Sequence, residues 1–396
     1  MKANEKTICM LSDMHGLFDD RIYWKEAVSL KKYGFNLIHI GFSDKEEDYI
    51  SNEGIRIISI PRLKYSKIFL FDRIIKTILF KKPYNTMLKK IKQTNAQVYT
   101  VHDLKINAII RKIKKLPQKP KLIYCIHEDY PDMIRDYTQR KGLAKILRFF
   151  YATLIEKWEI KKSTLYDYVI AFDDATFNKF NRLRNNTNTD LIYNFAEIDE
   201  IITDQPEKKW DICYVGSISK QRGILELIEA ISLTRSLKKD ISLLILGTIH
   251  DKIFDKIIRD KISKLSLESN IILHDAIDHK KVSEYIRSCR IGMVTLLPIP
   301  KYFKNIPIKQ FEYMACGLPV IGSNLPPIRK FVDPSNSGII VNPESPSDIS
   351  SAIIKLLNDK KLYSELSENA YKAAINHYNW KISEKKMYHI YSTLLL

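Results

Sequence analysis

The sequence predicts an α/β protein built from two doubly wound parallel sheets. Short apolar runs alternate with amphipathic helical stretches along the chain. The runs lack polar alternation, as expected for strands that are covered on both faces. The alternation passes through two cycles, and 396 residues exceed what one hydrophobic core usually supports. We therefore expect two Rossmann-like domains that face each other across a cleft, with a ligand at the carboxyl ends of the strands.

The first cycle predicts an amino-terminal domain over residues 1–195. It opens with the strand Thr7–Leu11 and an amphipathic helix that carries Lys25 and Ser29 on the face opposite its apolar residues. Further strands are expected at Leu37–Ile40, Ile55–Ile60, Val98–Val101, Leu122–Ile126, Tyr168–Phe172 and Leu191–Tyr193.

The second cycle predicts a carboxyl-terminal domain over residues 210–376, after a polar linker at 196–209. Its first strand, Asp211–Val215, leads through a polar loop to a helix from about Gly223 to Leu237. Further strands are expected at Leu243–Leu246, Ile271–Leu273, Ile291–Val294, Val320–Gly322 and Gly338–Val341. The remaining segment, residues 377–396, is predicted to end in a terminal helix.

Composition restricts the class of protein and the partners that it meets. The sequence has no apolar run long enough to span a bilayer or to form a signal peptide, so we expect a cytoplasmic protein. Its five cysteines are scattered and mostly lie inside apolar runs, which favours buried thiols over disulfides or a metal site.

The positive charge is concentrated in one region. The net charge is +18, yet residues 51–150 alone hold 23 Lys and Arg against 7 Asp and Glu. A biased genome would spread such an excess evenly, so this region is predicted to meet an anionic surface.

The loop Gly216–Gly223 is a candidate phosphate-binding site. It joins a strand to a helix, so free backbone N–H groups and the positive end of the helix dipole face any ligand there. Lys220 and Arg222 add full charges, and Gly216 and Ser217 begin the loop. The combination suits a diphosphate, although a basic loop that is only solvated has the same pattern.

A second candidate lies in the segment Asn305–Ile321. Pro307 suits the start of a short helix and Gly317 its end. Lys309 and Glu312 are three residues apart and share one face, so a cation for phosphate and a carboxylate for ribose hydroxyls would project together. An ordinary ion pair within the helix has the same spacing.

The residues around this helix resemble a known family. The stretch Phe311–Asn324, with Tyr214–Ser217 before it and Gly338–Pro343 after it, is similar to the retaining glycosyltransferases of family four. The resemblance implies the two-domain GT-B architecture, a nucleoside diphosphate sugar as the donor, and a terminal helix over 377–396 that crosses back to the first domain.

The resemblance also implies roles for residues of the second domain. Glu312 matches the second glutamate of the family's paired-glutamate motif, which binds the donor ribose, whereas Lys304 occupies the place of the first. Arg222 holds the place of the family's phosphate-binding lysine, and Ser217 stands where an arginine is common. Lys220 or Lys309 is therefore expected to supply the missing charge.

In the first domain, His127 resembles a histidine that faces the anomeric centre, and Glu128 follows it. His127 could equally be a structural residue beside Glu128. His15 with Asp19, Arg21 and Ile22 resembles the family's first-loop pattern, and Asp13, His15 and Arg21 are expected on this acceptor-side loop. The nucleophile stays open between Asp13, Glu128 and a front-face route through the acceptor.

We expect a glycosyltransferase that needs neither a metal nor a cofactor, because cationic side chains can stabilise the leaving diphosphate. The pair Asp173 and Asp174 is expected to cap a helix rather than to bind metal. Three alternatives remain: another enzyme of the same fold, such as an inverting transferase or a nucleotide-sugar epimerase; a nucleic-acid binder; and a membrane-bound scaffold without catalysis. No nucleic-acid-reading motif accompanies the basic charge, so nucleic acid is not the expected partner.

The segment 61–82 interleaves aromatic, aliphatic and basic residues, including Lys67, Arg73 and Lys76. Together with the other basic residues of 51–150, it predicts peripheral binding to the inner face of the cell membrane. A glycan or lipid-linked acceptor would be presented there.

Overall fold

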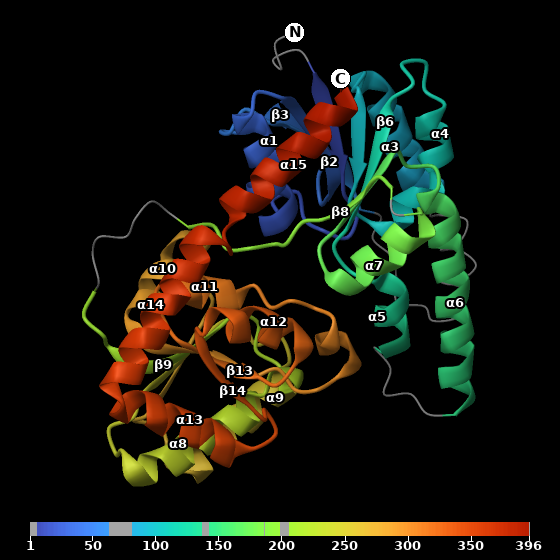
Figure 1. The fold of residues 1–396 in the computed structure, drawn as a ribbon. Helices are drawn as coiled ribbons and strands as arrows, with labels where there is room; N and C mark the ends of the chain where they lie inside the picture. Colours follow the sequence, from blue (N-terminus) through green and yellow to red (C-terminus); the bar gives the residue numbers. More distant parts are fainter. Residues whose placement is uncertain (1–5, 63–80, 137–141, 186, 199–205, 396) are drawn as a thin grey trace. The chain divides into compact units, whose positions relative to one another are not determined.

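The computed structural model describes residues 6–62, 81–136, 142–185, 187–198 and 206–395. The chain divides into two compact units. Unit 1 comprises Met1–Asn194 with Ser383–Leu396, and unit 2 comprises Phe195–Ile382. Each unit contains one sheet flanked by helices (Figure 1). The predicted α/β class with two Rossmann-like domains is confirmed.

The sheet of unit 1 has the strand order β3-β4-β2-β1-β5-β6-β7-β8. All neighbouring strands are parallel except β3, which pairs antiparallel with β4. The strands are β1 Thr7–Leu11, β2 Asn36–Ser43, β3 Glu47–Ile50, β4 Arg56–Pro61, β5 Val98–Val101, β6 Lys121–Ile126, β7 Tyr168–Ala171 and β8 Thr189–Leu191. The sequence pattern missed β3 because all four of its residues are exposed, so it has no apolar run.

The helical segments of unit 1 are η2 Asp20–Ala27, α1 Val28–Lys32, α3 Lys81–Thr94, η3 Leu104–Ala108, α4 Ile110–Lys114, α5 Tyr130–Asp136, α6 Leu143–Ser163, α7 Asp174–Leu183 and most of α15 Trp380–Leu395. Asp173 caps α7 by accepting a hydrogen bond from the Thr176 amide, which confirms its predicted capping role.

The first helical segment, η2 and α1, is buried on both sides rather than one. Lys25 and Ser29, predicted on a face apart from the apolar residues, are also buried. Lys25 Nζ donates to Asn194 Oδ1 at 2.9 Å, and Ser29 Oγ donates to Glu384 Oε2 of α15 at 2.8 Å. The terminal helix thus covers this polar face, a contact that local periodicity cannot reveal. The Tyr391 hydroxyl of α15 also lies 2.7 Å from Thr100 Oγ1 of β5.

The sheet of unit 2 is parallel throughout and has the order β11-β10-β9-β12-β13-β14. Its strands are β9 Trp210–Val215, β10 Leu243–Leu246, β11 Ile271–His274, β12 Cys289–Val294, β13 Val320–Ser323 and β14 Gly338–Val341. Its helical segments are η4 Lys220–Arg222, α8 Ile224–Leu237, α9 Lys252–Lys264, α10 His279–Arg287, η5 Pro300–Phe303, α11 Lys309–Ala315, α12 Pro326–Ser335, α13 Pro346–Asn358 and α14 Lys360–Asn376.

Each sheet has a point at which the strand order reverses. In unit 1 this point lies between β1 and β5, and in unit 2 between β9 and β12. Open α/β sheets bind ligands beside the carboxyl ends of the strands at such points. The two places to search for a site are therefore the loops after β1 and β5 and the loops after β9 and β12.

Two expectations about composition can be compared with the described residues. All five cysteines are free and buried, as predicted. Within the described residues, none of the helices combines the length and the apolar character that a bilayer crossing requires. Most of the basic segment 61–82, with Lys67, Arg73 and Lys76, lies outside the described residues.

Candidate active site

In unit 2, the loop after β9 forms one wall of the candidate site. Gly216 has a φ of +115°, and Gly223, directly before α8, has a φ of +69°. A Cβ atom at Gly223 would lie 2.0 Å from the carbonyl oxygen of Thr295, the residue that follows β12. Only glycine therefore lets this loop pass so close to the neighbouring strand end, and the loop delivers the amino terminus of α8 to the site.

The helix α11 brings Lys309 to this loop. Lys309 is buried, and its Nζ lies 3.5 Å from the centroid of the Tyr214 ring. It also lies 3.6 Å from where a Cβ atom of Gly216 would be. Among the described residues, Lys309 Nζ has no hydrogen-bond partner. Burial, and next the charge of Arg222, hold the pKa of Lys309 well below its usual range.

The short helix α11 is anchored at a specific place. The Tyr313 hydroxyl accepts a hydrogen bond from the Val215 amide at the end of β9 at 2.9 Å. After the helix, Gly317 has a φ of +70°, as its predicted role as a helix terminator requires. Glu312 lies one turn after Lys309 and is half-buried, and its negative charge offsets only part of the lowering of the Lys309 pKa.

The remaining predicted residues of this side lie on the loop itself. The Arg222 guanidinium lies 5.5 Å from the centroid of the Tyr302 ring, and the Arg222 carbonyl accepts a hydrogen bond from Thr295 Oγ1. Ser217 and Lys220 are exposed. The structure therefore brings Gly216, Arg222 and Lys309 together with Glu312, whereas Ser217 and Lys220 lie on the solvent side of the same loop.

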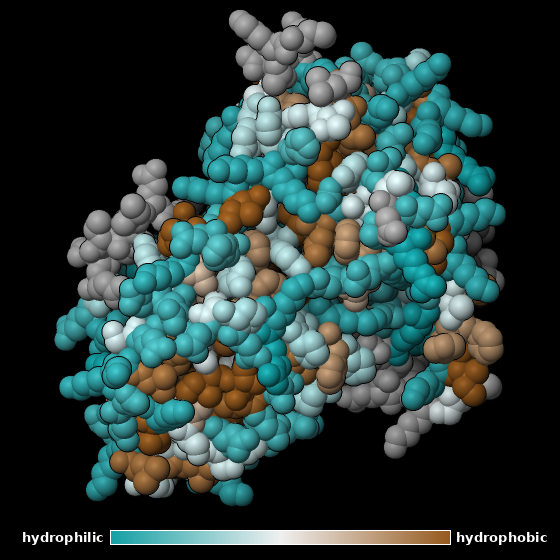
Figure 2. All heavy atoms as spheres, in the orientation of Figure 1, coloured by the Kyte–Doolittle hydropathy of each residue, from teal (hydrophilic) through white to brown (hydrophobic). Residues whose placement is uncertain are grey.

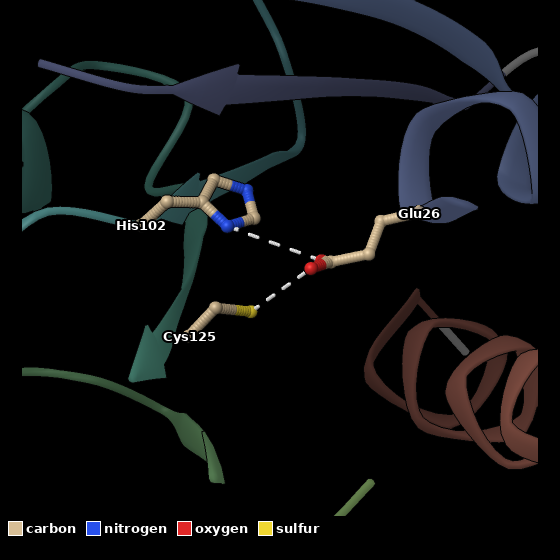
Figure 3. Close-up of side chains that lie close together, drawn as sticks. All are labelled: Glu26, His102 and Cys125. Atoms are coloured by element: carbon tan, nitrogen blue, oxygen red, sulfur yellow. Dashed lines mark hydrogen bonds and ion pairs between the residues drawn. The ribbon is translucent and has the colours of Figure 1, made fainter. Parts of the chain in front are cut away.

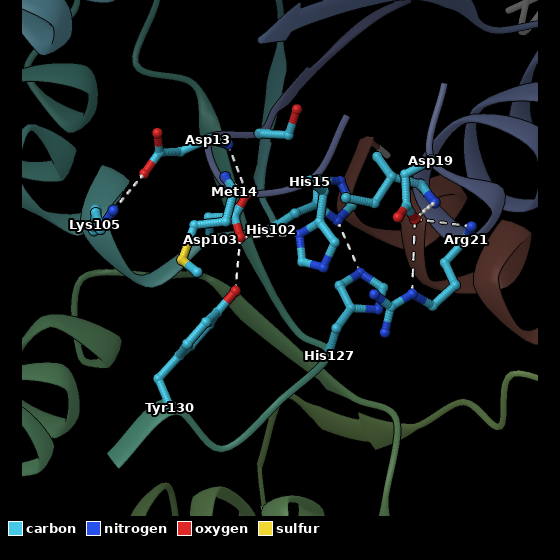
Figure 4. Close-up of polar contacts among 12 residues, drawn as sticks. Asp13, Met14, His15, Asp19, Arg21, His102, Asp103, Lys105, His127 and Tyr130 are labelled. Atoms are coloured by element: carbon cyan, nitrogen blue, oxygen red, sulfur yellow. Dashed lines mark hydrogen bonds and ion pairs between the residues drawn. The ribbon is translucent and has the colours of Figure 1, made fainter. Parts of the chain in front are cut away.

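In unit 1, polar residues follow three neighbouring strands. Asp13 comes after β1, His102 and Asp103 come after β5, and His127 comes after β6. Because the strands are parallel, these residues meet at one edge of the sheet. Figure 4 shows them converging from the three strand ends.

Asp103 is the centre of this group. One of its carboxylate oxygens accepts hydrogen bonds from the backbone amides of Asp13 and Met14, at 2.6 and 3.0 Å. The other accepts one from the Tyr130 hydroxyl at 2.7 Å and lies 2.9 Å from His15 Nδ1. Burial alone would raise the pKa of Asp103, but His15 and these donors together hold it well below its usual range. Asp103 thereby holds the loop after β1 in place.

The other acceptor-side residues are more accessible. Asp13 Oδ2 accepts a hydrogen bond from the Tyr84 hydroxyl at 2.8 Å and lies 3.6 Å from Lys105 Nζ. Arg21 Nε lies 3.6 Å from Asp19 Oδ1, and a quarter of the Arg21 side chain is exposed. Glu128 is half-buried.

His127 is packed inside unit 1. Its ring stacks on Phe172 with the centroids 4.1 Å apart, and its side chain is 1% exposed. Its Nε2 lies 3.1 Å from His102 Nδ1 and 3.2 Å from Glu26 Oε1. The side chain is therefore almost closed to solvent, and the ring orientation is set by buried neighbours.

Glu26 connects this group to the interior of unit 1. Its Oε2 lies 3.9 Å from both His102 Nδ1 and Cys125 Sγ (Figure 3). Burial raises the pKa of Glu26 and lowers the pKa values of His102 and His127, so the uncharged forms are favoured. Among the described residues, Glu26, His102 and Cys125 are the group whose spacing could hold a metal ion, since their ligand atoms lie within 4.8 Å of one another.

Sequence reasoning missed Glu26, His102, Asp103 and Tyr130. A signal for two of them was present, because the pair His102–Asp103 follows the strand Val98–Val101 just as His127–Glu128 follows the next strand. Glu26 and Tyr130 had no such signal, since only the fold brings them to this edge.

Comparisons with known proteins bear on the chemistry of these sites. Residues 196–373 match the family model of the glycosyl transferases group 1. A protein described as an uncharacterised glycosyltransferase of Methanocaldococcus jannaschii is 26% identical over 264 residues, which is 63% of this chain and 63% of that protein. The capsular polysaccharide biosynthesis glycosyltransferase CapM of Staphylococcus aureus is 23% identical over 346 residues, covering 78% of this chain and 88% of CapM.

Solved structures resemble nearly the whole chain. The sucrose-phosphate synthase of Thermosynechococcus elongatus superposes with a TM-score of 0.75 at 16% identity, over 99% of both chains. HepE of Anabaena, solved with UDP and glucose, superposes with a TM-score of 0.69 at 14% identity, over 98% of this chain and 100% of HepE. Residues 196–373 are therefore similar to the glycosyl transferases group 1, and the chain has the GT-B fold.

Proposed function

We propose that this protein transfers a sugar from a nucleoside diphosphate sugar to a glycan or lipid-linked acceptor, with retention of the anomeric configuration. The reaction would serve cell-surface polysaccharide or glycolipid synthesis. The observation that carries the proposal is Lys309, whose buried amino group has no hydrogen-bond partner among the described residues and lies next to the loop that opens α8. Burial lowers the pKa of Lys309 because the charged form is costly there, and an anionic ligand would stabilise that charged form.

The cationic groups of unit 2 suit the chemistry of the leaving group. When the bond between the sugar and the diphosphate breaks, negative charge develops on the diphosphate. Lys309, Arg222 and the backbone amides before α8 can stabilise that charge. The proposal therefore includes no metal, and Glu312 on the same helix would bind the ribose hydroxyls.

The groups of unit 1 would bind the sugar and the acceptor. His127 and Glu128 would contact the donor sugar, and Asp13, His15 and Arg21 would contact the acceptor. The name of CapM, which refers to capsular polysaccharide biosynthesis, supports a glycan acceptor. The crystal structures of HepE with UDP and UDP-glucose support a nucleotide-linked donor. An acceptor of this kind is presented at the inner face of the cell membrane.

The proposal is tested first by ligand-induced stabilisation. The full-length protein is heated with UDP, GDP and other nucleoside diphosphates, and then with their sugars. A ligand at 100 times its dissociation constant should add about 2.7 kcal/mol to the free energy of unfolding. No stabilisation by any nucleoside diphosphate would contradict the proposal. A donor that is turned over with inversion would point instead to an inverting transferase.

The variant Lys309→Met separates this role from a structural one. We expect it to bind the nucleoside diphosphate at least tenfold more weakly and, without ligand, to be more stable than the parent by about 1–3 kcal/mol, because a buried amino group without a hydrogen-bond partner within the described residues is removed. The control Lys281→Met removes an exposed lysine of the same unit and should change neither value. Unchanged affinity in Lys309→Met would remove Lys309 from the site.

A further inference from the structure

The outer side of α6 carries an unusual set of side chains. Six large apolar residues in its first half are each between 53% and 65% exposed: Ile146, Leu147, Phe149, Phe150, Tyr151 and Leu154. Figure 1 shows α6 along one edge of unit 1, and Figure 2 shows brown and tan apolar side chains at that edge. Exposed apolar patches of this kind mark binding surfaces more often than scattered single residues do.

These residues are not the core-facing side of the helix. The inner side of α6 packs through Ala152, which is fully buried, and Glu159, which accepts a hydrogen bond from Tyr124 at 2.6 Å. Arg148 also donates to the Ile134 carbonyl of α5 at 2.9 Å. An ordinary surface helix is polar on the side that faces away from its core. In α6 the outward side is apolar as well, so it is suited to contact a second apolar phase.

The same outward side becomes basic toward the end of the helix. Residues three or four apart share a face, so the row Ile146, Phe150 and Leu154 is followed by the exposed Lys157 and Lys161. Trp158 lies at the junction, and Lys162 Nζ lies 5.7 Å from the centroid of its ring.

The acids of α6 do not neutralise this side. Glu156 is paired with Arg135 and Lys179, and Glu159 is buried. The neighbouring helix α4 extends the basic end with Arg111: burial, and next the charge of Arg111, lower the pKa of Lys162. Residues 104–121 contain seven Lys and Arg and no Asp or Glu.

We propose that the outward face of α6 binds an anionic lipid membrane, with its apolar half inserted among the acyl chains and its basic half at the headgroups. Residues 146–154 span about 12 Å along the helix axis, comparable with the roughly 5–10 Å to which interfacial segments are buried. The order apolar, tryptophan, lysine follows the layers of a leaflet, from chains through the interface to anionic headgroups. This inference deepens the proposed function and rests on it only for the lipid-linked acceptor.

Co-sedimentation of the full-length protein with vesicles tests the proposal. Binding should be strong to vesicles rich in phosphatidylglycerol, weak to pure phosphatidylcholine, and reduced by salt. The double variant Leu147→Glu and Phe150→Glu should lose at least tenfold in affinity for anionic vesicles. The double variant Lys157→Gln and Lys161→Gln should keep weak binding but lose much of the preference for anionic lipid.

The matched control is the double variant Ile50→Glu and Leu237→Glu, at residues that are 72% and 75% exposed elsewhere in the chain. It introduces the same charge and should bind vesicles like the parent. Failure of the parent to bind anionic vesicles, or equal loss in the control, would overturn the proposal. So would a dimer of the parent that the Leu147 and Phe150 variant alone dissociates, because the face would then be a protein interface.

Turnover of a donor with a soluble acceptor, or its hydrolysis, is measured on the same variants and should be unchanged. If the protein turns over its donor but does not bind vesicles, only the proposal that α6 binds a membrane is wrong. A protein that binds vesicles through α6 but turns over no donor would overturn only the proposed function.

Discussion

Lys309 is a buried lysine whose amino group lacks, in the described part of the chain, the hydrogen-bond partners that a structural lysine usually has. A buried ammonium group usually has a carboxylate or several acceptors around it, whereas Lys309 Nζ rests on the Tyr214 ring at 3.5 Å. A cation above an aromatic ring recovers only about 0.5–2 kcal/mol, less than the cost of burying the charge. The remaining cost lowers the pKa of Lys309 in the free protein, and an incoming diphosphate would favour its charged form.

Asp103 represents the opposite case, a buried charge with all its acceptor sites used. Replacement by Asn keeps the shape but places an N–H donor against donors already present. We expect Asp103→Asn to lower the free energy of unfolding by about 3 kcal/mol, measured by urea denaturation at pH 7. The control Asp13→Asn, whose carboxylate is partly exposed, should cost about 1 kcal/mol or less.

The pH dependence of the Asp103→Asn deficit gives a second check. The pKa of Asp103 in the folded state lies below its unfolded value, so its stabilisation is present above about pH 4 and is lost as the pH falls through the folded pKa. The difference between parent and Asp103→Asn should therefore shrink from pH 7 to pH 3. A constant difference would mean that the carboxylate charge is not what the loop requires.

At this scale the sequence predicts the site only in part. Gly216, Arg222, Lys309 and Glu312 could be chosen because a strand–loop–helix pattern and a short capped helix are local signals. The burial of Lys309 over Tyr214 could not, because it depends on how α11 packs against β9. Likewise, Glu26 reaches His127 from a helix more than 100 residues away in the sequence.

At the scale of elements, apolar runs predict buried strands well and fail elsewhere. Strands such as Val98–Val101 and Leu243–Leu246 coincide with the predicted runs, since both faces are covered and every residue is buried. The edge strand β3 escaped this reasoning because none of its residues is buried. In α6, outward apolar residues resemble core residues in the sequence, and only the exposed area distinguishes them.

The packing of α6 against the sheet also makes unit 1 sensitive to pH. Burial raises the pKa of Glu159 to about 7, and this outweighs the hydrogen bond that it accepts from Tyr124. The folded state therefore holds a proton that the unfolded chain has already released near pH 4.3. Through this group, stability is greatest at low pH and falls as the pH rises toward 7.

We expect the variant Glu159→Gln to remove this dependence. Glutamine imitates the protonated carboxyl group and cannot ionise, so the stability of the variant relative to the parent should rise by about 3 kcal/mol between pH 5 and pH 8. Urea denaturation at the two pH values measures the difference. The exposed Glu368→Gln serves as the control and should show little change; a flat difference for Glu159→Gln would mean that this carboxyl is already ionised at pH 5.

At the scale of the whole molecule, the two units divide the proposed work. The described donor-side residues from Gly216 to Glu312 all belong to unit 2, which also has its own hydrophobic core. The group around Asp103 belongs to unit 1 and has a separate core. The sequence predicted two cycles of strands and helices, one for each unit. Charge and periodicity alone could not show that unit 2 begins at Phe195.

Phe195, predicted as the last residue of the amino-terminal domain, packs within unit 2. Its ring lies 4.8 Å from the centroid of Phe311 and 6.0 Å from that of Phe331, both edge-on. The Trp380 amide also donates to the Ala196 carbonyl at 2.9 Å. Phe311 is on the same helix as Lys309. This aromatic cluster therefore supports the helix α11, which carries the residue proposed to bind the diphosphate.

The packing of Phe195 predicts how fragments of unit 2 with and without this residue behave. A fragment of residues 195–382 should unfold cooperatively and bind the nucleoside diphosphate that stabilises the full chain, within about threefold of its affinity, while catalysing no transfer because it lacks unit 1. A second fragment, 206–382, lacks Phe195 and should be less stable by about 3 kcal/mol, the usual cost of removing a buried phenylalanine. Urea denaturation and calorimetric titration measure both quantities. Equal stability of the two fragments would show that the aromatic cluster does not support α11, and a folded 195–382 fragment without nucleotide affinity would show that the donor site needs groups from unit 1.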